Sequence, residues 1–369
     1  MRKIFIIIMI SFLLIYYNPN KLIFAQENPL LTANSLTLRK GESYNLNINN
    51  KIPNSKYKWY VDNNKIVSIN SKNGVIKGVN IGKTTVICKI VIDNRKITLK
   101  CNVVVIDDPI FFQYKLIAHA LGGYEGHIYN NTEEALINSI NNNFKFIEVD
   151  MTLTSDNELV CSHGWDKNTY EITGVLYDED NPEMDYQTFM DTKIQGKHKT
   201  IDATTIYKYM KSHPYIYFEI DLKKFDYDRT VILTHKLLEA FNNDAEVLDR
   251  LLIQVYDEEA YYAVNSVYSF KFYQYFVLKA ELKDMNKVVN FCKENNIVSV
   301  AINYKNIDNS IVNTFKSKGI YVLAHTVDDP DTAKELLDMG VNVICSNFLI
   351  YDDLKPGTSS IWTVARLLP

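Results

Sequence analysis

Acidic and basic side chains recur inside or just after short apolar stretches in the middle of this 369-residue chain. The residues concerned are His119, Glu148, Asp150, His163, Glu219, Asp221 and Lys223. Alternate residues of a β-strand point to the same side. Glu148 and Asp150 therefore share one face of a strand, and Glu219, Asp221 and Lys223 share a face of another.

Four carboxylates inside one fold repel each other strongly unless a cation neutralises them. An oxygen-rich site without Cys prefers Ca²⁺ or Mg²⁺, and such a cation can polarise a phosphoryl oxygen. Two nearby histidines can act as general base and general acid, because their pKa lies near neutrality, and Lys223 adds a positive group for a phosphate. Each feature is weak alone, but together they indicate phosphoryl transfer or cleavage of a phosphodiester.

Short apolar runs alternate with amphipathic helical patterns from about residue 112 to residue 350. Repeated strand–helix units imply a parallel sheet covered by helices, and about eight units in this length fit a closed α/β barrel, the (β/α)8 TIM barrel, better than an open sheet. The reactive side chains would then face the active site from the carboxyl ends of the strands. The predicted strands are 115–120, 146–152, 158–162, 215–222, 251–256, 271–277, 298–303, 321–326 and 341–346.

One of these strands exceeds the eight of a barrel, and we expect it to be accessory. The predicted pairing is a hairpin made by residues 146–152 and 158–162. Residues 164–200 read as an irregular insertion that forms part of a substrate lid. Gln254 and Tyr256 end another strand, where they either line the substrate pocket or simply fill the barrel.

Residues 32–106 show several short stretches of strand character, separated by Gly and Asn turns, and no convincing helix. This pattern predicts a small all-β antiparallel sandwich ahead of the barrel, with Trp59 in its core. The five cysteines are irregularly spaced and do not form a disulfide framework. Cys88 and Cys101 either form a disulfide across a hairpin or stay as two buried thiols.

The first 25 residues read as a secretory signal peptide. Arg2 and Lys3 precede an apolar run over residues 4–17, and Ala25 ends a candidate cleavage site. The alternative is an uncleaved anchor, although the run is short for a membrane span. We therefore expect a secreted or cell-surface protein in contact with the cell envelope or a membrane surface. The net charge of −4 argues against a nucleic-acid partner.

An ordered series of short motifs runs through residues 115–350. They are His119, Asn131-Thr132, Glu134-Ala135, Glu148-Val149-Asp150, Thr154-Ser155-Asp156-Asn157, His163, Asp221-Leu222-Lys223 and Thr326-Val327-Asp328. In order and spacing, this region resembles the glycerophosphodiester phosphodiesterase family and its relatives among phosphatidylinositol-specific phospholipases C. The resemblance implies that Glu148, Asp150 and Asp221 bind the metal. It also implies that His119 and His163 are the acid–base pair and that Lys223 contacts the phosphate.

The N-terminal segment carries Leu38-x-x-Gly41, Trp59, Ile66-Val67-Ser68-Ile69, a Gly-Val-Ile-Lys-Gly-Val run at 74–79 and Gly82. These residues resemble the bacterial Ig-like group 2 modules, over the whole of residues 32–106. The resemblance implies a spacer or adhesive unit of an exported protein.

Three departures from the phosphodiesterase pattern bear on the site. Ala120 replaces the family arginine after the first histidine, and Gly164-Trp165-Asp166 replaces the aspartate directly after the second. Asp221 replaces a glutamate, which makes Glu219 a rival ligand two residues earlier.

The resemblance predicts a secreted, metal-dependent hydrolase of glycerophosphodiesters or of related phosphodiesters in lipid headgroups and the cell envelope. One alternative is a metal-independent enzyme like the phosphatidylinositol-specific phospholipases C, which the dense carboxylates disfavour. The other is a non-catalytic surface binding protein, which Ala120 keeps open.

Overall fold

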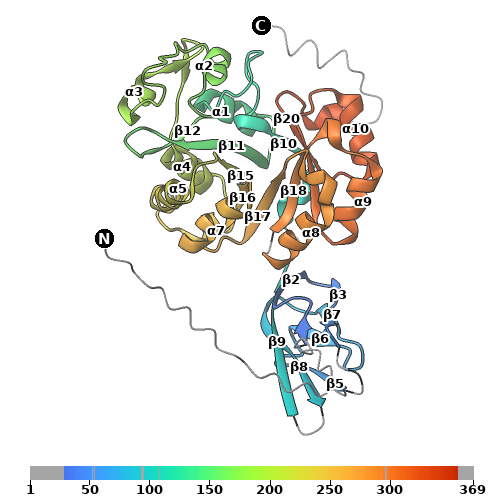
Figure 1. Ribbon diagram of the computed structural model, residues 1–369. Coiled ribbons are helices and arrows are strands. Elements are labelled where there is room, and N and C mark those ends of the chain that lie inside the picture. Colours follow the sequence, from blue (N-terminus) through green and yellow to red (C-terminus); the bar gives the residue numbers. More distant parts are fainter. Residues whose placement is uncertain are drawn as a thin grey trace, which may run out of the picture.

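The computed structural model describes residues 29–355 apart from positions 52, 54, 93, 94, 108 and 296. A small β-sandwich is joined to one end of a larger barrel that helices surround (Figure 1). The predicted signal peptide, residues 1–25, lies outside the described residues. Within the described ranges, every helix is too short or too polar to traverse a lipid bilayer.

Eight parallel strands close into the predicted TIM barrel, in the order β10-β20-β19-β18-β17-β16-β15-β11, with β11 pairing back to β10. A ninth strand, β12, pairs antiparallel with β11, which confirms the predicted accessory hairpin. The strands are β10 (Leu116–Ala118), β11 (Phe146–Leu153), β12 (Leu159–Cys161), β15 (Tyr217–Leu222), β16 (Leu251–Val255), β17 (Phe272–Val277), β18 (Ile297–Asn303), β19 (Tyr321–His325) and β20 (Val343–Ser346).

Helices cover the outside of the barrel, and most begin at an Asp or Thr whose side chain accepts a backbone N–H of the first turn. In α10, Asp329 caps the start and Gly340 ends the helix with a φ of 110°. The helices are α1 (Glu133–Asn141), α4 (Ala203–Ser212), α5 (Tyr227–Ala240), α6 (Ala245–Leu248), α7 (Glu258–Val267), α8 (Met285–Glu294), α9 (Asn309–Ser317) and α10 (Pro330–Met339). Short 3-10 helices are η2 (His119–Leu121), η3 (Glu281–Asp284), η4 (Tyr304–Asn306) and η5 (Tyr351–Leu354).

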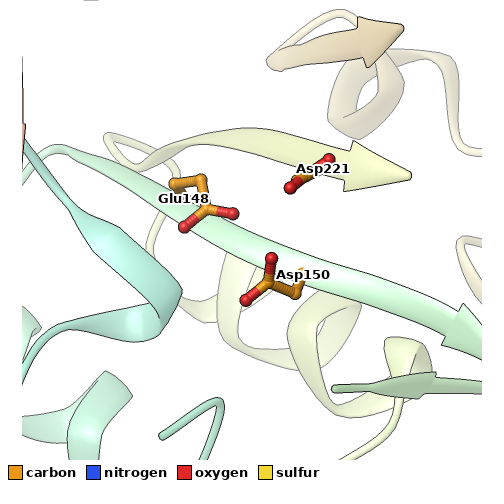
Figure 2. A group of neighbouring side chains, drawn as sticks. All are labelled: Glu148, Asp150 and Asp221. Carbon is orange, nitrogen blue, oxygen red and sulfur yellow. The ribbon is translucent and has the colours of Figure 1, made fainter. Parts of the chain in front are cut away.

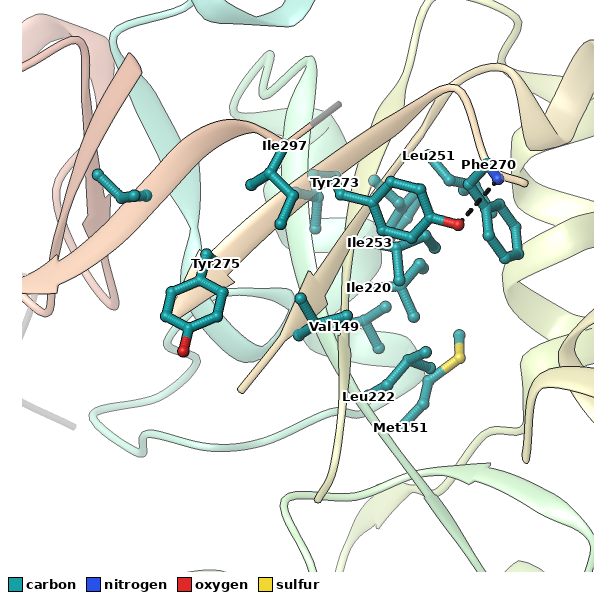
Figure 3. Packing of buried hydrophobic residues seen from close by; sticks show 14 of the residues in the cluster. Val149, Met151, Ile220, Leu222, Leu251, Ile253, Phe270, Tyr273, Tyr275 and Ile297 are labelled. Atoms are coloured by element: carbon teal, nitrogen blue, oxygen red, sulfur yellow. Dashed lines mark hydrogen bonds between the residues drawn. The ribbon is translucent and has the colours of Figure 1, made fainter. Parts of the chain in front are cut away.

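The apolar residues of the strands pack outward against these helices. Val149 and Met151 of β11 lie in one buried cluster with Ile220 and Leu222 of β15 (Figure 3), and Leu237 of α5 belongs to the same cluster. These strand residues alternate with the four acids singled out in the sequence. Since successive strand residues face opposite sides, the acids are directed into the barrel.

The insertion at residues 164–200 is more regular than predicted. It contains two short helices, α2 (Lys167–Thr173) and α3 (Tyr186–Asp191), and a hairpin of β13 (Lys193–Ile194) with β14 (His198–Lys199). Asp166 and Asp185 cap the two helices by accepting N–H groups of Thr169 and Thr188. Asp is a favoured residue at the start of a helix, so each of these helices begins at a common N-cap residue.

The N-terminal domain is the predicted sandwich with one correction. Its larger sheet has the order β2-β9-β8-β5, and β2 pairs parallel with β9, so the sandwich is not wholly antiparallel. The strands of this sheet are β2 (Ser35–Arg39), β5 (Lys56–Val61), β8 (Gly82–Ile92) and β9 (Arg95–Ile106). The other strands are β1 (Leu30–Leu31), β3 (Ser43–Asn45), β4 (Ile48–Asn49), β6 (Val67–Ile69) and β7 (Val75–Gly78).

Trp59 is buried in the core of the sandwich, as predicted. Gly74, with a φ of 76°, lets the chain pass the indole, because a Cβ there would lie 2.8 Å from the ring. Cys88 and Cys101 are free buried thiols. In the β8–β9 register Cys88 is opposite Leu99 and Cys101 is opposite Val86, so the two cysteines do not face each other.

The two domains meet at the end of the barrel where the strands begin. The connecting 3-10 helix η1 (Ile110–Gln113) inserts Phe111 and Phe112 into an apolar cluster with Phe146, Phe272 and other residues from the strand starts. From the sandwich, the Arg39 guanidinium lies 3.9 Å from the centre of the Tyr321 ring. Glu42 forms an ion pair of 2.7 Å with Lys293. The sandwich and η1 together form the floor of the barrel.

Candidate active site

Three carboxylates converge at the mouth of the barrel. Glu148 and Asp150 come from β11 and Asp221 from β15, and one oxygen of each lies within 4.8 Å of the others. All three side chains are buried, and Figure 2 shows them directed toward a common space. The parallel register places Asp150 beside Asp221. The structure thus brings together the three residues for which the sequence predicted metal binding.

Neighbouring groups hold these carboxylates in place. Lys223 Nζ forms an ion pair with Asp150 and another, of 2.5 Å, with Asp221. Tyr256 donates its hydroxyl to both oxygens of Asp221 at 2.8 Å. Asn131 Nδ2 donates to Asp150 Oδ2 at 2.8 Å, and its Oδ1 accepts the Asp150 N–H. Tyr256 therefore contacts a predicted ligand, and Asn131 is a positioning group to which sequence reasoning gave no role.

The turn after β10 supplies a further contact. Ala120 and Leu121 have φ values of 49° and 67°, and the Ala120 N–H donates to Glu148. Ala120, which stands at the family's arginine position, is fully buried. The arginines that the structure describes in the barrel are engaged elsewhere, Arg229 with Glu183 and Arg250 with backbone carbonyls. Among the described residues, Lys223 is the cation that forms ion pairs within this group, with two of the three acids.

Glu148 and Asp150 differ in how readily they hold a proton. Burial, followed by the charges of Asp150, Asp221 and Glu219, holds the pKa of Glu148 well above its ordinary value. Burial is also the largest single influence on Asp150, but the positive charges of Lys223, His163 and His119 and the hydrogen bond from Asn131 together outweigh it and keep the pKa of Asp150 low. Of the two acids, Glu148 therefore holds a proton more readily.

We expect binding of a divalent cation to release a proton and to tighten as the pH rises. A metal ligand must be deprotonated, and the raised pKa of Glu148 means that the proton is present below that pKa and absent above it. Calorimetric titration with Ca²⁺ in two buffers of different ionisation enthalpy measures the number of protons released. Glu148→Gln should remove the buffer dependence. Equal binding enthalpies in both buffers across the pH range would contradict the expectation.

Glu219 lies apart from this group, in a polar layer buried inside the barrel. Its Oε1 accepts from Gln274 Nε2 at 2.7 Å, and the same nitrogen donates to Gln254 Oε1 at 3.0 Å. Ser299 donates to Gln274 Oε1 at 2.9 Å. Burial and the charge of Asp221 raise the pKa of Glu219 well above its usual range. Glu219, the rival metal ligand, and Gln254, predicted either to line the substrate pocket or to fill the barrel, are thus tied to Gln274 within the barrel.

The two predicted catalytic histidines face the same side chain. The Tyr129 ring centre lies 4.9 Å from that of His119 and 4.5 Å from that of His163. Burial, followed by the charge of Lys223, lowers the pKa of His163 below its ordinary value, which favours the neutral ring. His325, at the end of β19, was not singled out in the sequence. Its Nε2 is buried and finds no hydrogen-bond partner among the described residues.

A hydrogen-bonded chain orients His119. Asn347 donates its Nδ2 to Asp328 Oδ2 at 2.7 Å, and its Oδ1 lies 2.8 Å from His119 Nδ1. An ionised carboxylate can only accept, so the amide NH₂ faces Asp328 and the amide oxygen faces the imidazole. His119 Nδ1 must then carry a proton, which leaves Nε2 of the neutral ring as the free acceptor.

His163 is oriented in a similar way. Its Nδ1 lies 3.3 Å from Thr169 Oγ1, whose hydroxyl donates to Asp166 Oδ2 at 2.8 Å. Because that hydroxyl proton is already used, Thr169 accepts from His163 Nδ1–H. Asp166, displaced by two residues from the family's aspartate position, is therefore connected to His163 through Thr169.

We expect Asn347→Leu to lower kcat by about 10-fold to 100-fold without changing metal content. The substitution removes the acceptor that fixes the His119 ring, and acid–base catalysis by a positioned histidine contributes on the order of 10² to 10⁴ in rate. Asn342→Leu is the matched control. Asn342 immediately precedes β20, where its Oδ1 accepts the Val322 N–H at 2.9 Å. Equal losses of kcat in both variants would show a structural role only.

Comparison with known proteins agrees with this architecture. The model of the glycerophosphoryl diester phosphodiesterase family matches residues 122–350, and that of the bacterial Ig-like domain (group 2) matches residues 29–97. The first match spans more than half of the chain and begins just after His119 and Ala120. The second confirms the resemblance of the sandwich to Ig-like modules. No curated protein sequence matches this chain.

Several solved structures share the fold at low sequence identity. A candidate glycerophosphoryl diester phosphodiesterase from Silicibacter pomeroyi is 15% identical, with a TM-score of 0.55, 69% of this chain covered and 92% of that one. A glycerophosphodiester phosphodiesterase from Parabacteroides distasonis is 21% identical, with a TM-score of 0.50 and coverages of 69% and 96%. A phosphodiesterase from Oleispira antarctica, in complex with the product sn-glycerol-3-phosphate, is 16% identical, with a TM-score of 0.50 and coverages of 63% and 93%.

Proposed function

The chain belongs to the glycerophosphoryl diester phosphodiesterase family, a family of phosphoric diester hydrolases, and we propose that it is a metal-dependent member. The substrates would be glycerophosphodiesters or related diesters of lipid headgroups and the cell envelope. The convergence of Glu148, Asp150 and Asp221 at the barrel mouth carries this proposal. Three carboxylates without sulfur or nitrogen ligands suit a hard cation such as Ca²⁺ or Mg²⁺.

When bound, such a cation would polarise a phosphoryl oxygen and offset the charge that develops on it. Lys223, beside two of the three acids, would contact another phosphate oxygen. Of His119 and His163, one would take a proton from the nucleophile and the other would protonate the leaving alkoxide. The Asn347 and Thr169 contacts support this pairing, because both leave Nε2 free when the ring is neutral.

Metal analysis of the purified protein followed by a substrate panel tests the proposal. We expect the protein to hydrolyse glycerophosphocholine, to lose the activity in EDTA and to regain it with Ca²⁺ or Mg²⁺. Full activity after chelation would favour the mechanism of the metal-independent phospholipases C. If the wild type turned over none of several phosphodiesters with any metal, the barrel would be a binding domain instead.

We also propose that the enzyme acts outside the cytoplasm, at the cell surface or after secretion. Arg2, Lys3 and the apolar run over residues 4–17 support export. N-terminal sequencing of protein recovered from the culture medium and from the membrane fraction distinguishes cleavage near residue 25 from an uncleaved anchor. Recovery of intact chain only in the cytosol would contradict export.

A further inference from the structure

Charge is divided very unevenly between the two domains. Residues 29–106 contain 13 Lys and Arg against 3 Asp and Glu, whereas residues 107–369 contain 24 against 40. The sandwich is therefore strongly basic and the remainder strongly acidic, although the whole chain carries a net charge of only −4. An acidic barrel repels a polyanionic substrate at long range. The basic sandwich can attract a polyanionic substrate that the acidic barrel alone would repel.

Part of this positive charge lies on one exposed face of the sandwich. The outward residues of β5, β8 and β9 include Lys56, Lys58, Lys89, Lys96 and Lys100, which we call the lysine face. The residues that alternate with them, such as Trp59, Cys88 and Cys101, are buried in the core. Tyr60 lies among the lysines, with the amines of Lys58 and Lys89 at 5.4 and 5.1 Å from its ring centre.

The fold itself gives no reason for this arrangement. Lys58 is directly opposite Lys89 in the β5–β8 register, and like charges in such a pair are destabilising. No ion pair joins the lysine face to any residue in the described part of the chain. Lysines often protect the edges of sheets from aggregation, but β8 and β9, which carry Lys89, Lys96 and Lys100, are the central strands of this sheet.

The position of the sandwich restricts which kind of ligand can contact both the lysine face and the active site. Its contacts with the barrel are made at strand starts, such as Val298 in β18 and Tyr321 in β19. The residues of the candidate active site lie at the other end, for example His119 directly after β10 and Asn347 directly after β20. One small diester cannot occupy both places, and a flat membrane cannot easily lie against both ends of the barrel. A long flexible chain can reach from one to the other.

We propose that the lysine face binds a flexible polymer of repeated phosphodiester groups and so keeps the free part of the same polymer within reach of the barrel mouth. This inference rests on the proposed function, because the tethered polymer is also the substrate. Several weak charge contacts along one chain add up to a stable attachment, and attachment raises the local concentration of cleavable diesters at the site.

Binding of fluorescent synthetic poly(glycerol phosphate) to the full chain, in low salt with EDTA so that the polymer stays intact, tests the proposal. The test variant is Lys58→Gln/Lys89→Gln/Lys100→Gln. The matched control, Lys65→Gln/Lys72→Gln/Lys77→Gln, removes the same charge from exposed positions outside that face. We expect the dissociation constant to rise about 10-fold or more in the test variant, with a weaker dependence on salt, and to change much less in the control.

Activity assays with restored metal complete the test. We expect both variants to hydrolyse glycerophosphocholine like the wild type and only the test variant to show a raised KM for the polymer. Equal weakening of polymer binding in the two variants would overturn the proposal, because net charge alone would then explain it. Equally tight, lysine-face-dependent binding to phosphatidylglycerol vesicles would also overturn it, in favour of a membrane surface. If the wild type cleaved no diester at all, the proposed function would fail while the EDTA binding data still decided the role of the lysine face.

Discussion

Asp150→Asn should reduce kcat by about 10³-fold or more while leaving the barrel folded. Asp150 is buried and contacts Lys223 and Asn131, and it is one of the three carboxylates that converge at the mouth. The amide keeps the shape but lacks the charge that holds a cation. Lewis-acid stabilisation of a phosphoryl group is worth several kcal/mol, and each ~1.4 kcal/mol corresponds to a factor of ten in rate. Steady-state kinetics and metal analysis on the same preparation check this result.

Glu219→Gln provides the matched comparison. Glu219 lies two residues before Asp221 and is buried like Asp150, but it hydrogen-bonds to Gln274 in the layer inside the barrel. Because its pKa is raised well above the ordinary range by burial and by Asp221, the protonated acid is close in shape and charge to glutamine. We expect this variant to retain metal and most of its activity. Loss of metal equal to that of Asp150→Asn would make Glu219 a fourth ligand.

Phe111→Ala should lower the free energy of unfolding of the barrel by about 3 to 5 kcal/mol, the usual cost of removing a buried phenyl ring. Phe111 is fully buried at the barrel floor. Its ring centre lies 4.8 Å from that of Phe112, 5.0 Å from Phe146 and 5.2 Å from Phe272. Truncation leaves a cavity that these neighbours, which belong to separate strands and to η1, can fill only in part. Urea unfolding followed by circular dichroism gives the change.

Ile110→Ala is the control for this measurement. Ile110 is in the same 3-10 helix but is 52% exposed, so we expect a change within about 0.5 kcal/mol. If Phe111→Ala were as mild as Ile110→Ala, the connector would be a simple linker and not part of the barrel floor. Retention of kcat by folded Phe111→Ala protein would agree with the distance between the floor and the catalytic mouth.

Features set by residues close together in sequence, such as the face of a strand or the end of a helix, could be predicted from the sequence. Strand alternation placed Glu148 and Asp150 on one face, and the structure has both beside Asp221. The Asp329-Pro330 start and Gly340 end of α10 were likewise readable from the chain. These features follow from side-chain periodicity and capping, which need no knowledge of distant residues.

Other features depend on residues that are distant in sequence. The parallel pairing of β2 with β9 joins segments about 65 residues apart, and the link from His119 to Asn347 spans 228 positions. Lys223, for which the family resemblance implied a phosphate contact, lies between Asp150 and Asp221. Strand alternation alone could not rank Glu219 against Asp221, because it directs both into the barrel, and the Gln274 contact is what separates their environments.

The position of Lys223 also bears on the cost of assembling the barrel mouth. Buried carboxylates repel one another and lose their hydration, and both effects oppose folding unless a positive charge lies among them. Here an ammonium group of the chain itself bridges Asp150 and Asp221. Part of the negative charge that the barrel buries is therefore balanced from within, by a side chain only two positions along from one of the acids.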